Sequence, residues 1–402
     1  MVEVRPMAPE ETMDTAEVWL RARKAAAPLV PLPVHPDEEV LAHFATRVAP
    51  RADVHVAVED GRVVAVLALQ DGWVEHLYVL PERTGTGVGS RLLQLAKDRN
   101  PEGLQLWAFQ SNEPALRFYA ERGFVEVERT DGAGNLERAP DVRMAWPGSR
   151  PPAPHDVVAV NLAPDADNRI HADDVAQSFG FAGALVPGVE VLALATVPMA
   201  RAWGEAWLAS GGLSLRFRRP VYDGERVTVA VDELLGVTVT GPDGVVRATG
   251  TAARPAAVGP PSAYDDVPLP ASLLAEPPPG ALGTVRVPAD PAACADYVRG
   301  IGDPLPLYDS WVHPGLLLRL VNLALMSNVA LGPWIHTASA ARFLGLARVD
   351  EDAQVRSRVT ERFTRNGNDY VRYDALVLAG GRPVVEVHHE AIWRLGPGPA
   401  PA

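Results

Sequence analysis

Short apolar runs separated by polar turns fill the first third of the chain. The runs DVHVAVE, GRVVAVLAL and WVEHLYVL follow one another, and Asp60-Gly61 between the first two is a hairpin turn signal. Apolar residues at helical spacing lie on both sides of these runs. We expect helices over residues 9–25, 36–48, 87–98 and 112–122, and further strands over 2–5 and 104–108. This order predicts an α/β segment with an antiparallel front half.

The remainder of the chain contains one order of elements twice. Each copy has a strand and a polar turn with a short Asp-rich motif, ADNRIHADD in the first and GDPLPLYDS in the second. A Pro-Gly dipeptide follows, at 187–188 and at 314–315, and then a long apolar run, VEVLALATVPMARAW or LLLRLVNLALMSNVAL. Several strands complete each copy. One long buried helix followed by strands predicts a sheet wrapped around a helix, used twice.

Two proline-rich stretches, 148–154 and 254–280, separate these parts. Proline removes an amide donor and fixes φ, so such stretches favour linkers over sheet or helix. We therefore expect three domains, at 1–147, 155–253 and 281–396. The expected fold class is mixed α/β (α+β).

Charge and cysteine content exclude several classes of function. The net charge is −13 over 402 residues, with no local excess of Lys and Arg to neutralise nucleic-acid phosphates. Cys294 is the only cysteine, so neither an intrachain disulfide nor a cysteine-based zinc site can form, and no metal site is assigned. No run of eighteen apolar residues and no signal-peptide pattern is present. We expect a cytoplasmic protein with no nucleic-acid or membrane partner.

The stretch PERTGTGVGSRLL is a candidate phosphate-binding loop. It has no Lys, which excludes a P-loop, and Ser90 occupies the third glycine position of the dinucleotide fingerprint. What remains is a set of backbone N–H groups at the start of a helix, which suits a pyrophosphate. The alternative is a tight turn that binds nothing.

Two motifs carry a resemblance to a known family. EHLYVLPERTGTGVGSRLL places Gly87 and Gly89 at two small positions of a glycine loop after a strand. SNEPALRFYAERGFVEVE matches the pattern Asn-x-x-Ala-x-x-Phe-Tyr-x-x-x-Gly-Phe. Residues 1–147 thereby resemble the GNAT superfamily of N-acetyltransferases. Thr84 stands where that family has Gln or Arg, with Arg83 one position earlier.

This resemblance implies acetyl-CoA as co-substrate and a small amine as acceptor. Tyr119 resembles the general acid that protonates the departing thiolate. Strand alternation places Glu75 on the face of Leu77, as a candidate base, and His76 on the opposite face, as a structural residue. The implied CoA-binding residues are Leu77, Val79, Thr84, Gly85, Thr86, Gly87, Val88, Gly89 and Asn112.

The first copy of the repeat resembles a second family. The stretch ADNRIHADDVAQSFGFAGALVPGV is similar to the motif of MaoC-like enoyl-CoA hydratases, which are hot-dog folds. The resemblance spans residues 155–253, and a weaker copy spans 281–396. Asn168 and His171 match, but Ala166 stands at the Asp position. In the second copy Asp303 has the expected spacing, but Tyr308 stands where His is expected. The implied fold is a double hot-dog.

Several functions stay open for this half. His171 with Asp167 could form a hydratase dyad, serve another acyl-CoA reaction such as thioester hydrolysis, or hydrogen-bond in a polar turn. With both Asp/His pairs incomplete, an inactive acyl-CoA sensor or a scaffold is the alternative. His313 and His336 could line a CoA channel or hydrogen-bond in the core. Two hot-dog units in one chain mimic the usual dimer, and a homo-oligomer of the chain is left open.

Overall fold

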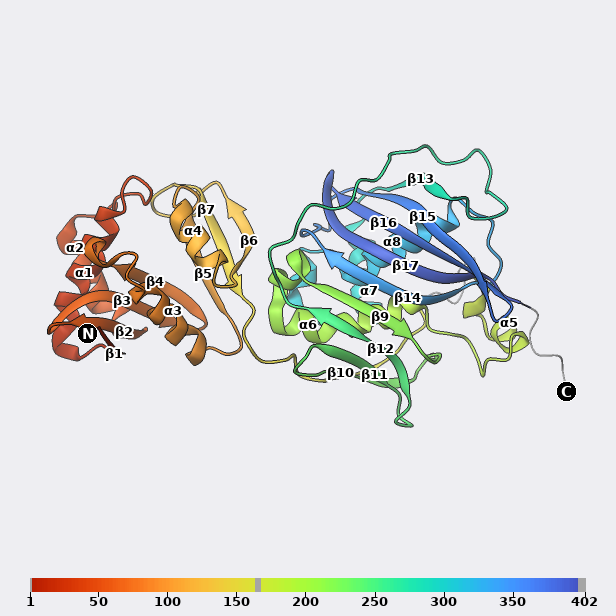
Figure 1. Ribbon diagram of the computed structural model, residues 1–402, viewed down its shortest axis with the longest axis horizontal. Coiled ribbons are helices and arrows are strands. Elements are labelled where there is room, and N and C mark those ends of the chain that lie inside the picture. The colour runs from red at the N-terminus through yellow and green to blue at the C-terminus, as the bar shows by residue number, and fades with distance from the viewer. Residues whose placement is uncertain (1, 163–167, 397–402) are drawn as a thin grey trace. The chain divides into compact units, whose positions relative to one another are not determined.

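The computed structural model describes residues 2–162 and 168–396 (Figure 1). The chain divides into two compact units, Met1–Arg150 and Pro151–Ala402. Both contain helices and sheets, so the expected mixed α/β class is confirmed. Asp167, the expected partner of His171, lies outside the described residues.

The N-terminal unit is a seven-stranded sheet with helices on both faces. The strand order is β1-β2-β3-β4-β5-β7-β6. The strands are β1 Glu3–Pro6, β2 Asp53–Glu59, β3 Arg62–Gln70, β4 Trp73–Val79, β5 Leu104–Phe109, β6 Val125–Thr130 and β7 Asp141–Trp146. The helices are α1 Thr12–Ala25, α2 Asp37–His43, α3 Val88–Arg99 and α4 Glu113–Ala120. Val66 of β3 packs with α1 and α2, whereas Leu67 packs with α3, because successive strand residues point to opposite faces.

Strands β2 and β3 form the hairpin that the sequence predicts. Asp60 and Gly61 at its turn both have positive φ, 49° and 74°, which a two-residue turn of this kind requires. Strands β4 and β5 are parallel, and their recorded pairing is Trp73 with Gln105. They separate beyond that pair, so the end of β4 has a free edge on the side of β5, just before α3 begins.

The C-terminal unit is built on a ten-stranded antiparallel sheet, in the order β13-β15-β16-β17-β14-β9-β12-β11-β10-β8. The strands are β8 His155–Val158, β9 Gly212–Phe217, β10 Arg226–Val231, β11 Gly236–Thr240, β12 Val246–Ala253, β13 Gly280–Val287, β14 Ile335–Phe343, β15 Ala353–Arg365, β16 Asn368–Ala379 and β17 Arg382–Arg394. The helices are α5 Asp173–Ser178, α6 Gly188–Ser210, α7 Pro291–Ile301 and α8 Pro314–Met326.

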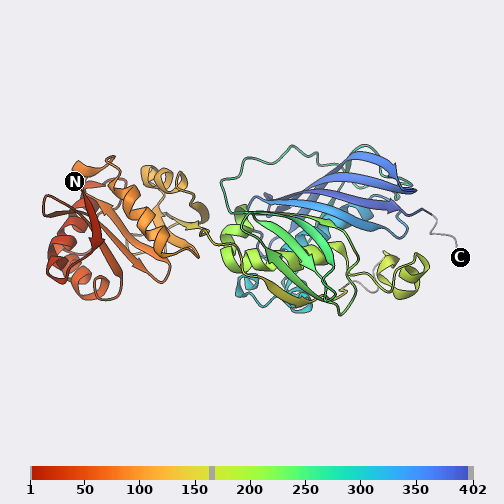
Figure 2. The ribbon, with the colours of Figure 1, turned by 60° about the horizontal axis from the view of Figure 1, so that its bottom comes forward.

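Each half of this sheet packs around one long helix. Helix α6 packs against β8, β9, β10 and also β14, whereas α8 packs against β13, β15, β16 and β17, within one continuous hydrophobic core (Figures 1 and 2). The halves are joined where β14 pairs with β9, from Ala338 opposite Arg216 to Arg342 opposite Gly212. The prediction of a helix-wrapped sheet used twice, the double hot-dog, is confirmed.

The proline-rich segment between the two halves is fixed to the sheet. Residues 254–279, all of which the structure describes, contain no helix or strand. The Ser262 amide and the Tyr264 hydroxyl both donate to Glu386 on β17, each at 3.0 Å. Arg342 donates to the other oxygen of the same carboxylate at 2.6 Å. Glu386 therefore anchors a segment that has no regular backbone pairing of its own.

Within the described ranges, we find no helix with both the length and the apolar character needed to cross a bilayer.

Candidate functional site

A cavity of about 450 Å³ opens where β4 ends and α3 begins. It lies beside the free edge of β4 and under the first turn of α4. Its lining residues are Leu77, Val79, Arg83, Thr84, Gly85, Gly87, Gly89, Ser90, Pro114, Ala115, Phe118, Tyr119 and Arg122. The structure thus brings together the two sequence motifs, which residues 94–110 separate along the chain.

The glycine loop has the geometry of an anion site. Gly85 and Gly87 have φ of 78° and 87°, a region that other residues rarely adopt, and Gly87 is the cap of α3. The first-turn amides of α3 have no acceptor within the helix, and its dipole places partial positive charge at the same end. A phosphate or pyrophosphate is the chemistry that such a helix end accepts.

Other residues of the predicted CoA set have local roles. Thr86 Oγ1 donates to the Arg83 carbonyl at 2.6 Å, and the Val88 side chain is 3% exposed in the core. Their side chains are therefore turned away from the cavity, and only their amides are available to it. Asn112 caps α4 by accepting from the Ala115 amide at 3.3 Å and is not among the described residues that line the cavity.

Tyr119 reaches the cavity from α4. Its ring packs between Phe118 and Phe124, with centroid distances of 5.2 and 5.5 Å. Burial raises the pKa of the Tyr119 hydroxyl well above its usual range, and the neighbouring Tyr78 acts in the same direction. The hydroxyl therefore keeps its proton at neutral pH, as a proton donor must.

Glu75 lies where strand alternation fails. Ala68 of β3 pairs with His76, but Leu69 pairs with Val74, so Glu75 is the extra residue of a bulge. Its side chain is exposed, and it is not among the described residues that line the cavity. The expectation that Glu75 shares a site with Leu77 rested on an unbroken strand, and the bulge removes that basis.

Two arginines at the cavity were not identified as site residues from sequence. Arg83 pairs with Glu59. Arg122 donates to the Phe118 carbonyl at 2.8 Å and to Ser90 Oγ at 2.9 Å, with its guanidinium 3.9 Å from the Phe118 ring centroid. The four-residue spacing of Phe118 on α4 and Arg122 in the turn just after it was the available signal.

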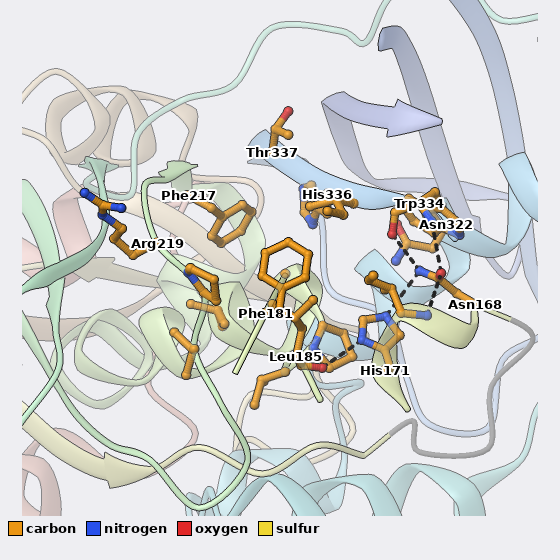
Figure 3. A pocket seen from close by; sticks show the side chains of 18 of the residues that line it. Asn168, His171, Phe181, Leu185, Phe217, Arg219, Asn322, Trp334, His336 and Thr337 are labelled. Atoms are coloured by element: carbon orange, nitrogen blue, oxygen red, sulfur yellow. Dashed lines mark hydrogen bonds between the residues drawn. The ribbon is translucent and has the colours of Figure 1, made fainter. Parts of the chain in front are cut away.

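A second cavity, of about 190 Å³, lies in the C-terminal unit at the start of α6 (Figure 3). His171 Nδ1 is 2.8 Å from the Leu185 carbonyl, which can only accept, so Nδ1 carries the ring proton. Nε2 is then an acceptor and faces Asn168 Nδ2 at 3.3 Å. Burial lowers the pKa of His171, so the ring is neutral at pH 7. His171 is thus oriented by two partners within the described residues.

Asn168 joins the two repeats at this cavity. Its amide donates to the Trp334 carbonyl at 2.9 Å and accepts from the Trp334 amide at 3.1 Å, across 166 positions of sequence (Figure 3). The cavity is therefore built from both hot-dog halves.

His336 of the second repeat lines the same cavity. A Cβ on Gly188 would lie 2.6 Å from His336 Nδ1, so only glycine fits at the start of α6. His336 Nε2 lies 2.8 Å from Ser339 Oγ, which lies 2.9 Å from His389 Nδ1. Burial lowers the pKa of His336 to about 3. His336 thus has the core hydrogen bond that was one of its two expectations, and the cavity that it lines leaves the other, a CoA channel, as a prediction.

The second repeat contains an Asp/His pair that the motif spacing did not predict. Asp303 Oδ2 lies 3.3 Å from Nε2 of His313, ten residues on, and Tyr308 packs on the same ring. The side chains of Asp303 and His313 are 1% and 0% exposed, and His313 caps α8. The expectation that Asp303 has no histidine partner is wrong, but this pair is enclosed in the core.

Comparison with known proteins bears on the cavity beside α3. Residues 50–126 match the family described as acetyltransferase (GNAT) domain. The N-terminal unit contains a GNAT acetyltransferase domain. The matched range includes β4, the glycine loop and Tyr119, which together form the cavity.

Two curated relatives align with part of the GNAT domain. The peptidyl-lysine N-acetyltransferase YiaC of Escherichia coli (strain K12) is 33% identical over 91 residues, covering 22% of this chain and 60% of the relative. An uncharacterized N-acetyltransferase of Archaeoglobus fulgidus is 32% identical over 97 residues, covering 20% of this chain and 64% of the relative. The chain thus spans less than two thirds of the length of either relative.

A solved structure aligns mainly outside the GNAT domain. It is a MaoC domain protein, described as a dehydratase, from Chloroflexus aurantiacus J-10-fl. The likeness has a TM-score of 0.41 and 12% sequence identity, and covers 61% of this chain and 96% of the other.

The GNAT domain also has a polar cluster that sequence reasoning missed. Arg23 of α1 pairs with Glu137 of the loop after β6, and both charges act on Tyr78 of β4. His76, expected to be structural, packs on Trp19 at 4.8 Å between ring centroids. No local motif signals this cluster, because its members lie on three distant elements.

Proposed function

We propose that the GNAT domain transfers an acetyl group from acetyl-CoA to an amine. The observation that carries this proposal is the meeting of the α3 amides, the free edge of β4 and the Tyr119 hydroxyl at one cavity. The family match and the names of the two relatives support it. Leu77 and Val79 offer backbone groups to the pantetheine amides, and the loop from Thr84 to Gly89 offers its amides to the pyrophosphate.

The chemistry follows from this placement. The neutral amine, having released one proton to water, attacks the thioester carbonyl carbon, so a C–N bond forms and the C–S bond breaks. The CoA thiolate takes the proton of the buried Tyr119 hydroxyl. The nitrogen, positively charged once the C–N bond has formed, releases its second proton to water. The neutral amide and CoA then leave, and Tyr119 recovers a proton from solvent. Glu75 has no role in this step, because it is exposed at the bulge.

Charge reversal at the glycine loop tests the proposal. Gly89 has no positive φ, and a Cβ there meets Val79 at an ordinary 3.5 Å, so a side chain can be added. Gly89→Asp places a carboxylate at the anion site, and Gly89→Asn is the uncharged control of equal size. By calorimetry on the full chain, we expect Gly89→Asp to bind acetyl-CoA at least about 10-fold more weakly than Gly89→Asn. Equal affinities of the two variants would show that this loop does not bind the diphosphate of acetyl-CoA.

We also infer that the second cavity binds the acyl part of a CoA thioester. Support comes from its place at the start of α6, where backbone amides can donate hydrogen bonds to a carbonyl oxygen, and from the oriented His171. Incubation of the full chain with crotonyl-CoA separates the alternatives. Hydration that His171→Ala abolishes supports a hydratase, release of free CoA supports a thioesterase, and binding without turnover supports a sensor. If Gly89→Asp, which blocks only the GNAT site, abolishes all binding of crotonyl-CoA, the second cavity does not bind it and the inference is overturned.

A further inference from the structure

An ion pair in the GNAT domain joins α1 to the loop between β6 and β7. Arg23 Nη2 donates to Glu137 Oε1, although the residues lie 114 positions apart. Each side chain is 14% exposed, so the pair is neither a free surface contact nor a sealed one. Arg23 Nε is buried and has no hydrogen-bond partner among the described residues. Glu137 therefore binds one end of the Arg23 guanidinium, while the Nε–H group of the same side chain has no acceptor among the described residues.

The loop that carries Glu137 is fixed without help from Arg23. Asn135 Nδ2 donates to the Ala139 carbonyl at 2.7 Å and to Asp141 at 2.9 Å, and its Oδ1 accepts from the Ala139 amide at 3.2 Å. The Gly132 amide donates to Thr130 Oγ1 at 3.0 Å. Because these bonds close the loop on both sides of Glu137, its backbone stays in place when the partner of its carboxylate changes.

The pair acts on the residues next to the proposed acid. Burial raises the pKa of Tyr78, while Arg23 lowers it and Glu137 raises it. Tyr78 in turn raises the pKa of Tyr119. Burial lowers the pKa of His76 to about 4, and Arg23 and His43 act in the same direction. The ion pair thus acts on Tyr78, which lies on β4 between Leu77 and Val79, two residues that line the CoA cavity.

We propose that Glu137 binds the acceptor as a protonated primary amine, and that Arg23 occupies this carboxylate until the acceptor displaces it. The inference rests on the proposed acetyl transfer and names its substrate class. An ammonium can replace a guanidinium at a carboxylate, because both are cationic donors. Leu136, which precedes Glu137 in the chain, is 72% exposed and offers apolar surface there. An amine on an aliphatic stem, such as a lysine side chain, fits these surroundings.

Substitutions of Glu137 and of Arg23 are expected to change acceptor binding in opposite directions. This difference distinguishes a role in acceptor recognition from a purely structural ion pair. The measurement is the Kd of Nα-acetyl-lysine amide for the full chain saturated with CoA. We expect Glu137→Gln to weaken binding about 10-fold or more, because the acceptor loses its counter-charge. Arg23→Met removes the competitor, so binding becomes tighter or stays equal. A structural ion pair would weaken binding alike in both variants, and that result would overturn the inference.

Matched controls complete the experiment. Glu128 pairs with Arg143 at 3.0 Å in the same sheet, so Glu128→Gln should leave the Kd unchanged. The hydroxyl analogue of the probe, which lacks the positive charge, should bind at least about 10-fold more weakly than the amine. Equal binding of the two probes overturns the inference, and so does a wild-type chain that binds no amine. The proposed function fails on a different result, which is that the chain does not bind CoA.

Discussion

At the scale of single residues, the proposed transfer depends on a phenol that is held away from water. Tyr119 packs between two phenylalanines, and burial keeps its pKa above the usual range. Its hydroxyl is therefore in the form that can protonate a thiolate throughout the physiological range. Removing that one oxygen changes the chemistry and leaves the packing of the ring intact.

We predict that Tyr119→Phe lowers kcat by about 100-fold or more and leaves the KM for acetyl-CoA unchanged, because only proton donation is lost. Steady-state kinetics with an amine that the wild type acetylates is the measurement. The raised pKa adds a pH expectation. The wild-type rate should show no loss from Tyr119 ionisation up to about pH 10. A variant with the wild-type kcat would exclude Tyr119 as the acid.

Gly188 offers a second residue-scale prediction. A methyl group at this position would overlap the His336 ring, with 2.6 Å to Nδ1. We expect Gly188→Ala to lower the free energy of unfolding by about 1–3 kcal/mol, as overpacking of a core does. Gly259, which has nothing within 4 Å of an added Cβ, supplies the control Gly259→Ala. Urea unfolding of both variants is the measurement, and equal stability would contradict the close packing.

At the scale of elements, the proline-rich segment has no helix or strand of its own, and Glu386 is one of the groups that fix it to the sheet. Burial alone would raise the pKa of Glu386, but hydrogen bonds from Arg342, Ser262 and Tyr264 outweigh it and lower the pKa to about 2. A group with a lowered folded-state pKa stabilises the protein above its unfolded value of 4.5 and loses that contribution as the pH falls toward 2.

We predict that Glu386→Gln destabilises the chain at pH 7 by about 1–3 kcal/mol, because a charged acceptor of several hydrogen bonds is lost. The difference from the wild type should shrink as the pH is lowered from 4.5 toward 2. Chemical unfolding of both proteins at pH 7, 5 and 3.5 measures it. A difference that stays constant with pH would show that the charge of Glu386 does not contribute.

Elements were predictable where side-chain periodicity decides them. The β2–β3 hairpin follows from alternating residues and Asp60-Gly61, and the two buried helices follow from long apolar runs. Periodicity fails at Glu75, because a bulge inserts one residue without any change in composition. It also fails for Asp303 with His313, where the helix cap supplies a partner outside the motif spacing.

The candidate site was predictable only as far as its motifs extend. The glycine loop and Tyr119 are local signals, and the structure places both at one cavity. Arg23 and Glu137 meet across 114 positions, and Asn168 and Trp334 across 166, so a single sequence contains no trace of either contact. Such pairs depend on tertiary packing, which local patterns do not encode.

At the scale of the whole molecule, the chain has two compact units with separate hydrophobic cores. Each core can unfold as its own cooperative unit. We therefore predict two transitions in scanning calorimetry. Acetyl-CoA should raise the midpoint of one of them by mass action, and Gly89→Asp should remove that shift. A single transition for the whole chain, with and without acetyl-CoA, would contradict independent cores.

Residues 254–279 join the two halves covalently, and the pairing of β14 with β9 joins their sheets, so one polypeptide holds two units of a kind that usually pair as separate subunits. In a symmetric dimer every substitution appears twice, so both sides must tolerate it. Covalent fusion lifts that constraint, because each half can accept changes that its counterpart never experiences. The first half accordingly places His171 at an open cavity that both halves line, whereas the second half encloses Asp303 and His313 in the core.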